Sequence, residues 1–188
     1  MNKLHKKIEY HIKIKKSLLK LNKEISNSTK VITNSIKKGG KIMFCGNGGS
    51  AADAQHLVAE LIVRLNIKNR KSLPAISLAL DTSTITACAN DLQYKYIFSR
   101  ALEGLGNKKD VLVVLSTSGN SKNIIEVLKT AKKMKIKTIG FLGNNGGSCR
   151  KLCDTNLIVK SNSTETIQEC HIFLGHYILG NVEKNISK

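Results

Sequence analysis

The stretch CGNGGSAADAQHLVAEL, residues 45–61, joins a glycine-rich turn to a histidine and a glutamate that are four residues apart. The turn follows an apolar run and precedes a helical run, so its backbone N–H groups would face an anion at the positive end of a helix dipole. His56 and Glu60 would share one face of that helix. Such a pair can ligate a metal ion, but a lone pair of this kind is more often an exposed polar face.

Three other interpretations of the glycine-rich turn have to be weighed. GNGGSA fits a loose G-x-G-x-x-A dinucleotide pattern, but the acidic residue expected about twenty positions later is missing. A nucleotide-binding P-loop is excluded because no lysine follows the glycines. A tight turn without any ligand stays open on the glycines alone.

A second polar turn, STSGNS at 116–121, follows the apolar run 111–115 and precedes another helical run. Its hydroxyl-bearing residues are Ser116, Thr117, Ser118 and Ser121. Hydroxyls and backbone amides at a helix N-terminus suit a phosphomonoester held by neutral donors, although Ser121 alone could be a helix cap. Because loops at the carboxyl ends of neighbouring parallel strands face one crevice, we expect both turns to contact one ligand.

The C-terminal helical stretch TETIQECHIFLGH, residues 164–176, adds further candidate ligands. Gln168 and His176 are about two turns apart and lie roughly on one side of the predicted helix. Together with His56 and Glu60 they would form a four-coordinate nitrogen and oxygen site of the kind that zinc accepts. Spacing alone does not establish that the four residues meet.

The elements that must position these residues follow an α/β pattern. Short apolar runs at 42–45, 75–80, 111–115, 138–142 and 156–159 alternate with helical or loop segments. This alternation predicts one domain with a doubly wound parallel sheet covered by helices on both faces. Residues 3–38 are expected to form one or two amphipathic helices outside the sheet, and 164–186 a C-terminal helix capped by Thr164.

Composition limits the location and the fold class. The 188 residues contain 41% hydrophobic residues, enough for a packed core. No apolar run approaches the roughly 18 residues of a membrane span, and the charged N-terminus does not resemble a secretory signal. We therefore expect no membrane association and a cytoplasmic location. The five cysteines fit neither a disulfide framework nor paired zinc motifs, so they are expected to be reduced and mostly buried.

The net charge of +18 raises the question of a nucleic-acid partner. Only Arg64, Arg70, Arg100 and Arg150 are arginines among the 31 basic residues, and aromatic residues make up 4% of the chain. Base reading favours arginine and stacking needs aromatic rings, so we expect no nucleic-acid partner. The same positive field would attract small anionic substrates.

Five ordered motifs, CGNGGSAADAQH, LPAISLALDTS, ANDLQYKYIFSR, STSGNS and IQECH, together resemble the phosphoheptose isomerase branch of the sugar isomerase (SIS) domain family. The resemblance covers nearly all of residues 40–180. It implies a flavodoxin-like SIS domain that assembles as a homotetramer with active sites between subunits, in which residues 1–38 contribute to oligomer packing. It also implies conversion of sedoheptulose 7-phosphate to D-glycero-D-manno-heptose 7-phosphate, the first step towards nucleotide-activated heptose for lipopolysaccharide or other surface glycans.

Carried over position by position, the resemblance implies one zinc ion per subunit, with Glu60 as catalytic base and His176 as the group that serves the oxygens. The implied zinc ligands are His56, Glu60, Gln168 and His176. The implied substrate contacts are Asn47, Gly48, Gly49, Asn90, Asp91 and Gln168 for the sugar, and Ser116, Thr117, Ser118 and Ser121 for the phosphate. One position departs from the family, since Thr166 stands where its members usually have arginine.

Two alternatives share this fold, and fold alone does not decide between them. A paralogue of the isomerase is a non-enzymatic tetramer that binds the bacterial replication initiator protein. That paralogue typically lacks the acid at Glu60, the serine at Ser118 and the histidine at His176, all of which this chain keeps. A regulatory sugar-phosphate-binding module would bind the same ligand without turnover.

Overall fold

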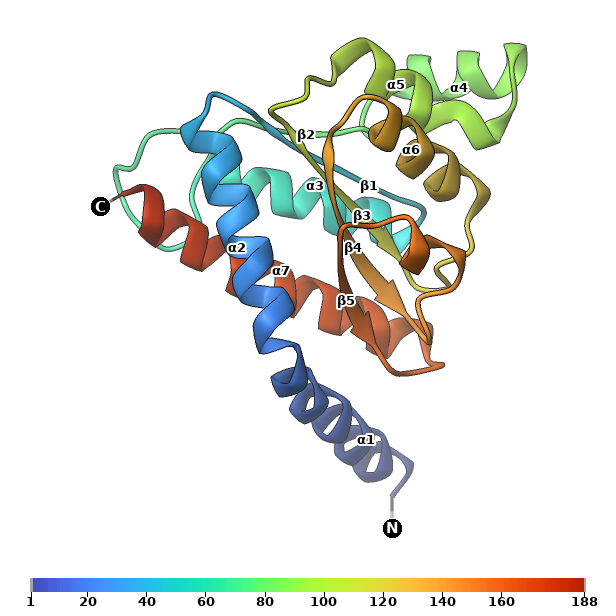
Figure 1. Cartoon of the computed structure of the whole chain (residues 1–188). Helices are drawn as coiled ribbons and strands as arrows, with labels where there is room; N and C mark the ends of the chain where they lie inside the picture. The colour runs from blue at the N-terminus through green and yellow to red at the C-terminus, as the bar shows by residue number, and fades with distance from the viewer. Residues whose placement is uncertain (1, 188) are drawn as a thin grey trace.

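A five-stranded parallel sheet, in the order β2-β1-β3-β4-β5, forms the centre of the computed structural model, which describes residues 2–187 (Figure 1). The strands are β1 (Ile42–Gly46), β2 (Ala75–Ser77), β3 (Val111–Ser116), β4 (Lys137–Gly143) and β5 (Thr155–Val159). All neighbouring strands pair in parallel. This is the flavodoxin-like strand order, so the predicted doubly wound α/β fold is confirmed.

Helices cover both faces of the sheet and extend the chain beyond it. They are α1 (Lys3–Ser17), α2 (Asn22–Lys37), α3 (Gly49–Ile62), α4 (Thr82–Asp91), α5 (Ile97–Leu105), α6 (Lys122–Lys133) and α7 (Thr164–Ile186). Short 3₁₀ turns occupy η1 (Leu18–Leu21), η2 (Tyr94–Tyr96) and η3 (Ser148–Lys151). The predicted N-terminal helical segment is thus two helices joined by η1, and α1 extends away from the sheet (Figure 1).

Two local predictions were wrong. The cap of α7 is Ser163 rather than Thr164, because the Ser163 side chain accepts the backbone N–H of Thr166. The strand expected at 75–80 ends at Ser77, whose hydroxyl accepts the backbone N–H of Ala79 at 3.2 Å. A serine that bonds to the backbone two residues later favours a turn, and this turn stops the strand.

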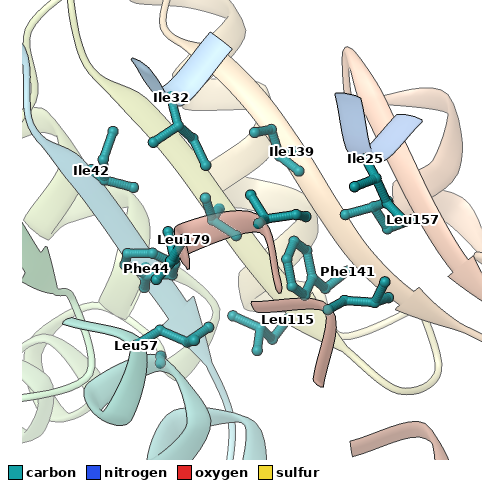
Figure 2. Packing of buried hydrophobic residues seen from close by; sticks show 14 of the residues in the cluster. Ile25, Ile32, Ile42, Phe44, Leu57, Leu115, Ile139, Phe141, Leu157 and Leu179 are labelled. Atoms are coloured by element: carbon teal, nitrogen blue, oxygen red, sulfur yellow. The ribbon is translucent and has the colours of Figure 1, made fainter. Parts of the chain in front are cut away.

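The core has two parts because side chains alternate across the sheet. Ile42 and Phe44 of β1 pack with α2, α3 and α7 on one face, whereas Met43 and Cys45 pack with α5 and α6 on the other. Figure 2 shows the first part, where Ile32, Leu57 and Leu179 meet the strand residues. This packing fixes α3 and α7 against the same face of the sheet.

The remaining composition-based expectations concern cysteines and membranes. All five cysteines lie within the described residues as free thiols; four are buried and Cys153 is partly buried. Across residues 2–187, the helices are all too short or too polar to cross a bilayer.

One titratable group lies in the core between α7 and β4. His171 is fully buried, and its ring stands edge-on to Phe141 with 5.9 Å between the ring centroids. Burial lowers the pKa of His171 from 6.5 to about 4, so the folded protein keeps this imidazole neutral at physiological pH.

The lowered pKa of His171 should make the free energy of unfolding depend on pH. Between pH 6.5 and 4 the unfolded chain binds a proton on His171 that the folded chain does not, so stability falls as pH falls. We expect the wild type to lose about 3 kcal/mol more than His171→Leu between pH 7 and pH 4. Urea denaturation of both proteins across this range measures the difference, and parallel pH profiles would contradict it.

Candidate functional site

The turn between β1 and α3 requires its glycines. Gly48 has a φ of +55° and stands at the N-cap position of α3. A Cβ atom on Gly46 would lie 2.6 Å from the backbone oxygen of Ser50. A Cβ atom on Gly49 would lie 2.5 Å from Nε2 of Gln168. The turn is therefore closely packed, and the Gln168 side chain of α7 lies directly against it.

The turn between β3 and α6 is braced by the segment that follows β4. Gly119 has a φ of +65°, and a Cβ atom there would collide with the backbone oxygen of Gly146. Asn120 adds a bond between the same two segments, because its Oδ1 accepts the backbone N–H of Ser148 at 2.9 Å. This close approach of two backbones holds the hydroxyl-bearing turn in one conformation.

The hydroxyls of this turn differ in how they are bonded. Ser116 Oγ accepts the N–H of Gly119, and Ser118 Oγ accepts the N–H of Asn120, both at 3.1 Å. Ser121 occupies the N-cap position of α6, but its side chain caps no N–H group of the described helix. Its Oγ lies 3.5 Å from Ser116 Oγ instead. The Ser121 hydroxyl therefore remains available to a ligand at the start of α6.

Asn47, which follows β1, contacts two residues that the sequence interpretation missed. Its side-chain amide pairs reciprocally with that of Asn123, at 2.7 and 3.0 Å, and its Oδ1 also accepts the Tyr94 hydroxyl at 3.1 Å. Asn90 and Asp91 lie in the last turn of α4 and are hydrogen-bonded to each other at 2.8 Å. Tyr94, three residues after Asp91, is therefore the residue of this segment that contacts Asn47 of the glycine-rich turn.

An open pocket of about 820 Å³ lies where these segments meet. Asn47 of the first turn and Ser121 of the second both line it, together with Tyr94 and Asn123. Lys122 also lines this pocket and adds positive charge beside Ser121. One pocket therefore receives residues from both turns, as expected for loops at the carboxyl ends of adjacent parallel strands.

A second group of polar side chains forms where α3 packs on α7. Nε2 of His56 lies 2.9 Å from Nε2 of His176 and 3.1 Å from Oε1 of Glu60. Nε2 of His176 lies 3.9 Å from the same Glu60 oxygen. The side chains of His56, Glu60 and His176 are 51%, 19% and 39% exposed, so a ligand can reach them.

The donor atoms of this cluster fit a metal ion. The two histidine nitrogens and the carboxylate oxygen lie within 4.8 Å of one another. Zinc ligands at about 2.0–2.1 Å in a tetrahedron stand about 3.3 Å apart, which is close to the separations observed here. Gln168 lies against Gly49. Its predicted role as fourth ligand stays a prediction.

Asp53, on the same helix as His56 and one turn before it, was missed by the sequence interpretation. Its Oδ2 is buried and has no hydrogen-bond partner among the described residues. Burial raises the pKa of Asp53, and the nearby His56 offsets part of that rise. The i, i+3 spacing was the available sequence signal, since it places Asp53 and His56 on neighbouring positions of one helix face.

Comparison with known proteins identifies the family of this chain. The SIS domain family model matches residues 9–143. A protein named phosphoheptose isomerase 1 from Campylobacter jejuni is 44% identical over 98% of this chain and 99% of its own length. A phosphoheptose isomerase from Paramagnetospirillum magneticum is 52% identical over 80% of this chain and 78% of its own length.

Solved structures of phosphoheptose isomerases are also similar to this chain. A phosphoheptose isomerase from Francisella tularensis superposes with a TM-score of 0.92 at 32% identity, covering 98% of this chain and 100% of that chain. A phosphoheptose isomerase from Neisseria gonorrhoeae gives a TM-score of 0.89 at 35% identity, covering 96% and 97%. The chain therefore belongs to the SIS domain family, in its phosphoheptose isomerase branch.

Proposed function

We propose that this sugar-phosphate isomerase of heptose biosynthesis converts sedoheptulose 7-phosphate to D-glycero-D-manno-heptose 7-phosphate. The product would feed the synthesis of nucleotide-activated heptose for lipopolysaccharide or other surface glycans. The observation that carries the proposal is the convergence of His56, Glu60 and His176 between α3 and α7. An aldose–ketose isomerisation needs a base for a carbon-bound proton and an acid for the oxygens, and this cluster offers both.

Glu60 is the proposed base. It would take a proton from C1 of the ketose and return it to C2, so that the sugar passes through an enediol. His176 would give a proton to the oxygen on C2 and take one from the oxygen on C1. When bound, one zinc ion per subunit on His56, Glu60, Gln168 and His176 would supply Lewis-acid polarisation of the carbonyl.

The two turns are proposed to hold the rest of the substrate. Ser116, Thr117, Ser118 and Ser121 would bind the phosphate, supported by the available Ser121 hydroxyl at the N-terminus of α6. Asn47, Gly48, Gly49, Asn90, Asp91 and Gln168 would contact the sugar. In the free protein the Asn47 amide is held by Asn123 and Tyr94. Part of this pairing would therefore be exchanged for sugar hydroxyls on binding.

We further propose that residues 1–188 act as one SIS domain in a cytoplasmic homotetramer with active sites between subunits. The helical segment 1–38 would pack between subunits. Support comes from α1, where Leu4, Ile8 and Ile12 recur every four residues and are 62%, 50% and 48% exposed. An apolar stripe this exposed on a helix that extends from the fold suits contact with a second copy.

Substitution of the base tests the isomerase most directly. In Glu60→Gln we expect kcat with sedoheptulose 7-phosphate to fall roughly 10²- to 10⁴-fold, because the amide cannot accept the C1 proton. A coupled assay for the aldose phosphate measures turnover, and circular dichroism confirms folding. Zinc content should be measured in parallel, since Glu60 is also a proposed ligand.

The matched control is Glu103→Gln, which removes an exposed carboxylate paired with Arg100 on α5 and should leave kcat unchanged. His56→Ala separates the two roles of Glu60, because it removes a proposed ligand but not the base. An inactive zinc-loaded wild type would favour the initiator-binding tetramer if it bound no sugar phosphate, and the regulatory module if it did.

The phosphate turn can be tested by removing one hydroxyl. Because Ser121 caps no described N–H group, Ser121→Ala should leave the unfolding midpoint unchanged. Loss of a hydrogen bond to a charged phosphate should raise KM roughly tenfold or more. Steady-state kinetics measure this change, and Ser83→Ala, which alters an exposed serine in the first turn of α4, is the control. An unchanged KM would remove Ser121 from the phosphate site.

The oligomer proposal predicts a change in mass. Replacing both Ile8 and Ile12 with lysine should reduce the tetramer to smaller species, because like charges would face each other across the α1 interface. Light scattering measures the mass directly. Glu9→Lys adds a lysine to the same helix outside the apolar stripe, and it should leave the tetramer intact. A double variant that stays tetrameric would exclude this face from the interface.

A further inference from the structure

The segment that follows α3 folds back over the end of that helix. The last carbonyl groups of a helix have no partners within it. Here the backbone N–H of Leu73 donates to the oxygen of Leu61 at 3.0 Å, and Nη2 of Arg70 donates to the oxygen of Glu60 at 2.6 Å. Nη1 of Arg70 donates to the oxygen of Lys71 at 2.9 Å. A cation is thus bonded directly to the backbone of the proposed base.

Glu183 of α7 holds the same segment from the other side. Its carboxylate accepts the backbone N–H groups of Leu65, Asn66 and Ile67 at 3.1, 2.8 and 3.1 Å. It also accepts Nε of Arg70 at 2.6 Å. The side chains of Arg70 and Glu183 are only 3% and 1% exposed. Four donors on one buried carboxylate make this a fixed junction, since buried charges need such partners.

The junction links the two helices that carry the metal-ligand cluster. Arg70 is bonded to the backbone of Glu60, and Glu183 follows His176 by seven residues, which is two helical turns on nearly the same side of α7. α3 and α7 are in direct contact, and Figure 1 shows them side by side. A displacement at the junction would therefore be transmitted to the distance between Glu60 and His176.

We propose that Arg70 and Glu183 form a positioning pair that sets the end of α3 against α7 and so holds His56, Glu60 and His176 at ligand distance. The catalytic consequence rests on the function proposed above, whereas the positioning itself does not. Arginine is required because three of its nitrogens donate in three directions, to Glu183, Glu60 and Lys71. A lysine has one nitrogen and can keep the ion pair without this geometry.

The chain offers a matched control in a second buried ion pair, Asp110 with Lys41, whose two residues belong to neither α3 nor α7. Asp110 is 3% exposed and precedes β3, and its carboxylate accepts the backbone N–H groups of Lys41 and Asn107 at 2.9 and 2.8 Å. Nζ of Lys41 also donates to it at 2.6 Å. This buried ion pair resembles the junction in chemistry, but it lies at the amino ends of β1 and β3 rather than beside the cluster.

The test compares Arg70→Lys with Asp110→Asn in the full chain. In the metal-free proteins, nuclear Overhauser contacts between the imidazole rings of His56 and His176, whose centroids are 5.0 Å apart, report the cluster directly. Zinc affinity, measured by competition with a chromophoric chelator, and the absorption spectrum of bound Co²⁺ report the ligand geometry. Thermal unfolding reports stability.

We expect Arg70→Lys to lose the ring contact, to weaken zinc binding roughly 10- to 100-fold and to change the Co²⁺ spectrum. Asp110→Asn should keep all three properties even where it unfolds at a lower temperature. The inference is overturned if Arg70→Lys keeps the ring contact, or if Asp110→Asn loses it to the same degree. If Arg70→Lys does not fold, the same measurements on Glu183→Gln decide the inference.

These measurements distinguish the proposed metal site from the proposed positioning pair. A wild type that shows the ring contact but binds no zinc would contradict the proposed metal site. The positioning inference would still be decided by the ring contact in the variants. A wild type that binds zinc and turns over the substrate, beside an Arg70→Lys protein with the ring contact intact, would leave the function standing and remove the positioning role.

Discussion

The close parallel packing of α3 on α7 is the constraint on which the candidate site depends. Gly175 of α7 allows it, because a Cβ atom there would lie 2.5 Å from Cδ2 of Leu57 on α3. At one end of this contact the Gln168 side chain lies against Gly49. A larger residue at Gly175 would push against the buried Leu57 and separate the helices. The histidines of the two helices meet at 2.9 Å only because their backbones approach this closely.

The sheet supplies the second constraint, since it fixes where the two turns lie. β1 and β3 are neighbours in parallel register, so the turns that follow them end at one edge of the sheet. Glycines then let the backbones approach, as at Gly119 against Gly146. Two parts of the candidate site therefore suit different tasks. The neutral donors at the start of α6 suit an anionic group, and the cluster between α3 and α7 suits proton transfer and a metal ion.

The sequence predicted the parts of this arrangement that are local or repeat a known pattern. Apolar runs identified the strands, and the i, i+4 spacing identified one side of the cluster. Local spacing could not predict contacts between distant residues, and only the family resemblance implied that His176 meets His56 and Glu60. The pairing of Asn123 with Asn47 spans 76 positions, and that of Arg70 with Glu183 spans 113. Such contacts are set by how the strands are ordered, which no local propensity encodes.

Anomalous X-ray diffraction at the zinc absorption edge, on crystals of zinc-loaded protein, tests the central claim most directly. The account predicts one strong anomalous peak per subunit between Nε2 of His56, Nε2 of His176 and the Glu60 carboxylate, at about 2.0–2.1 Å from the donor atoms. A peak elsewhere, or a zinc-loaded crystal with no peak between α3 and α7, would contradict it.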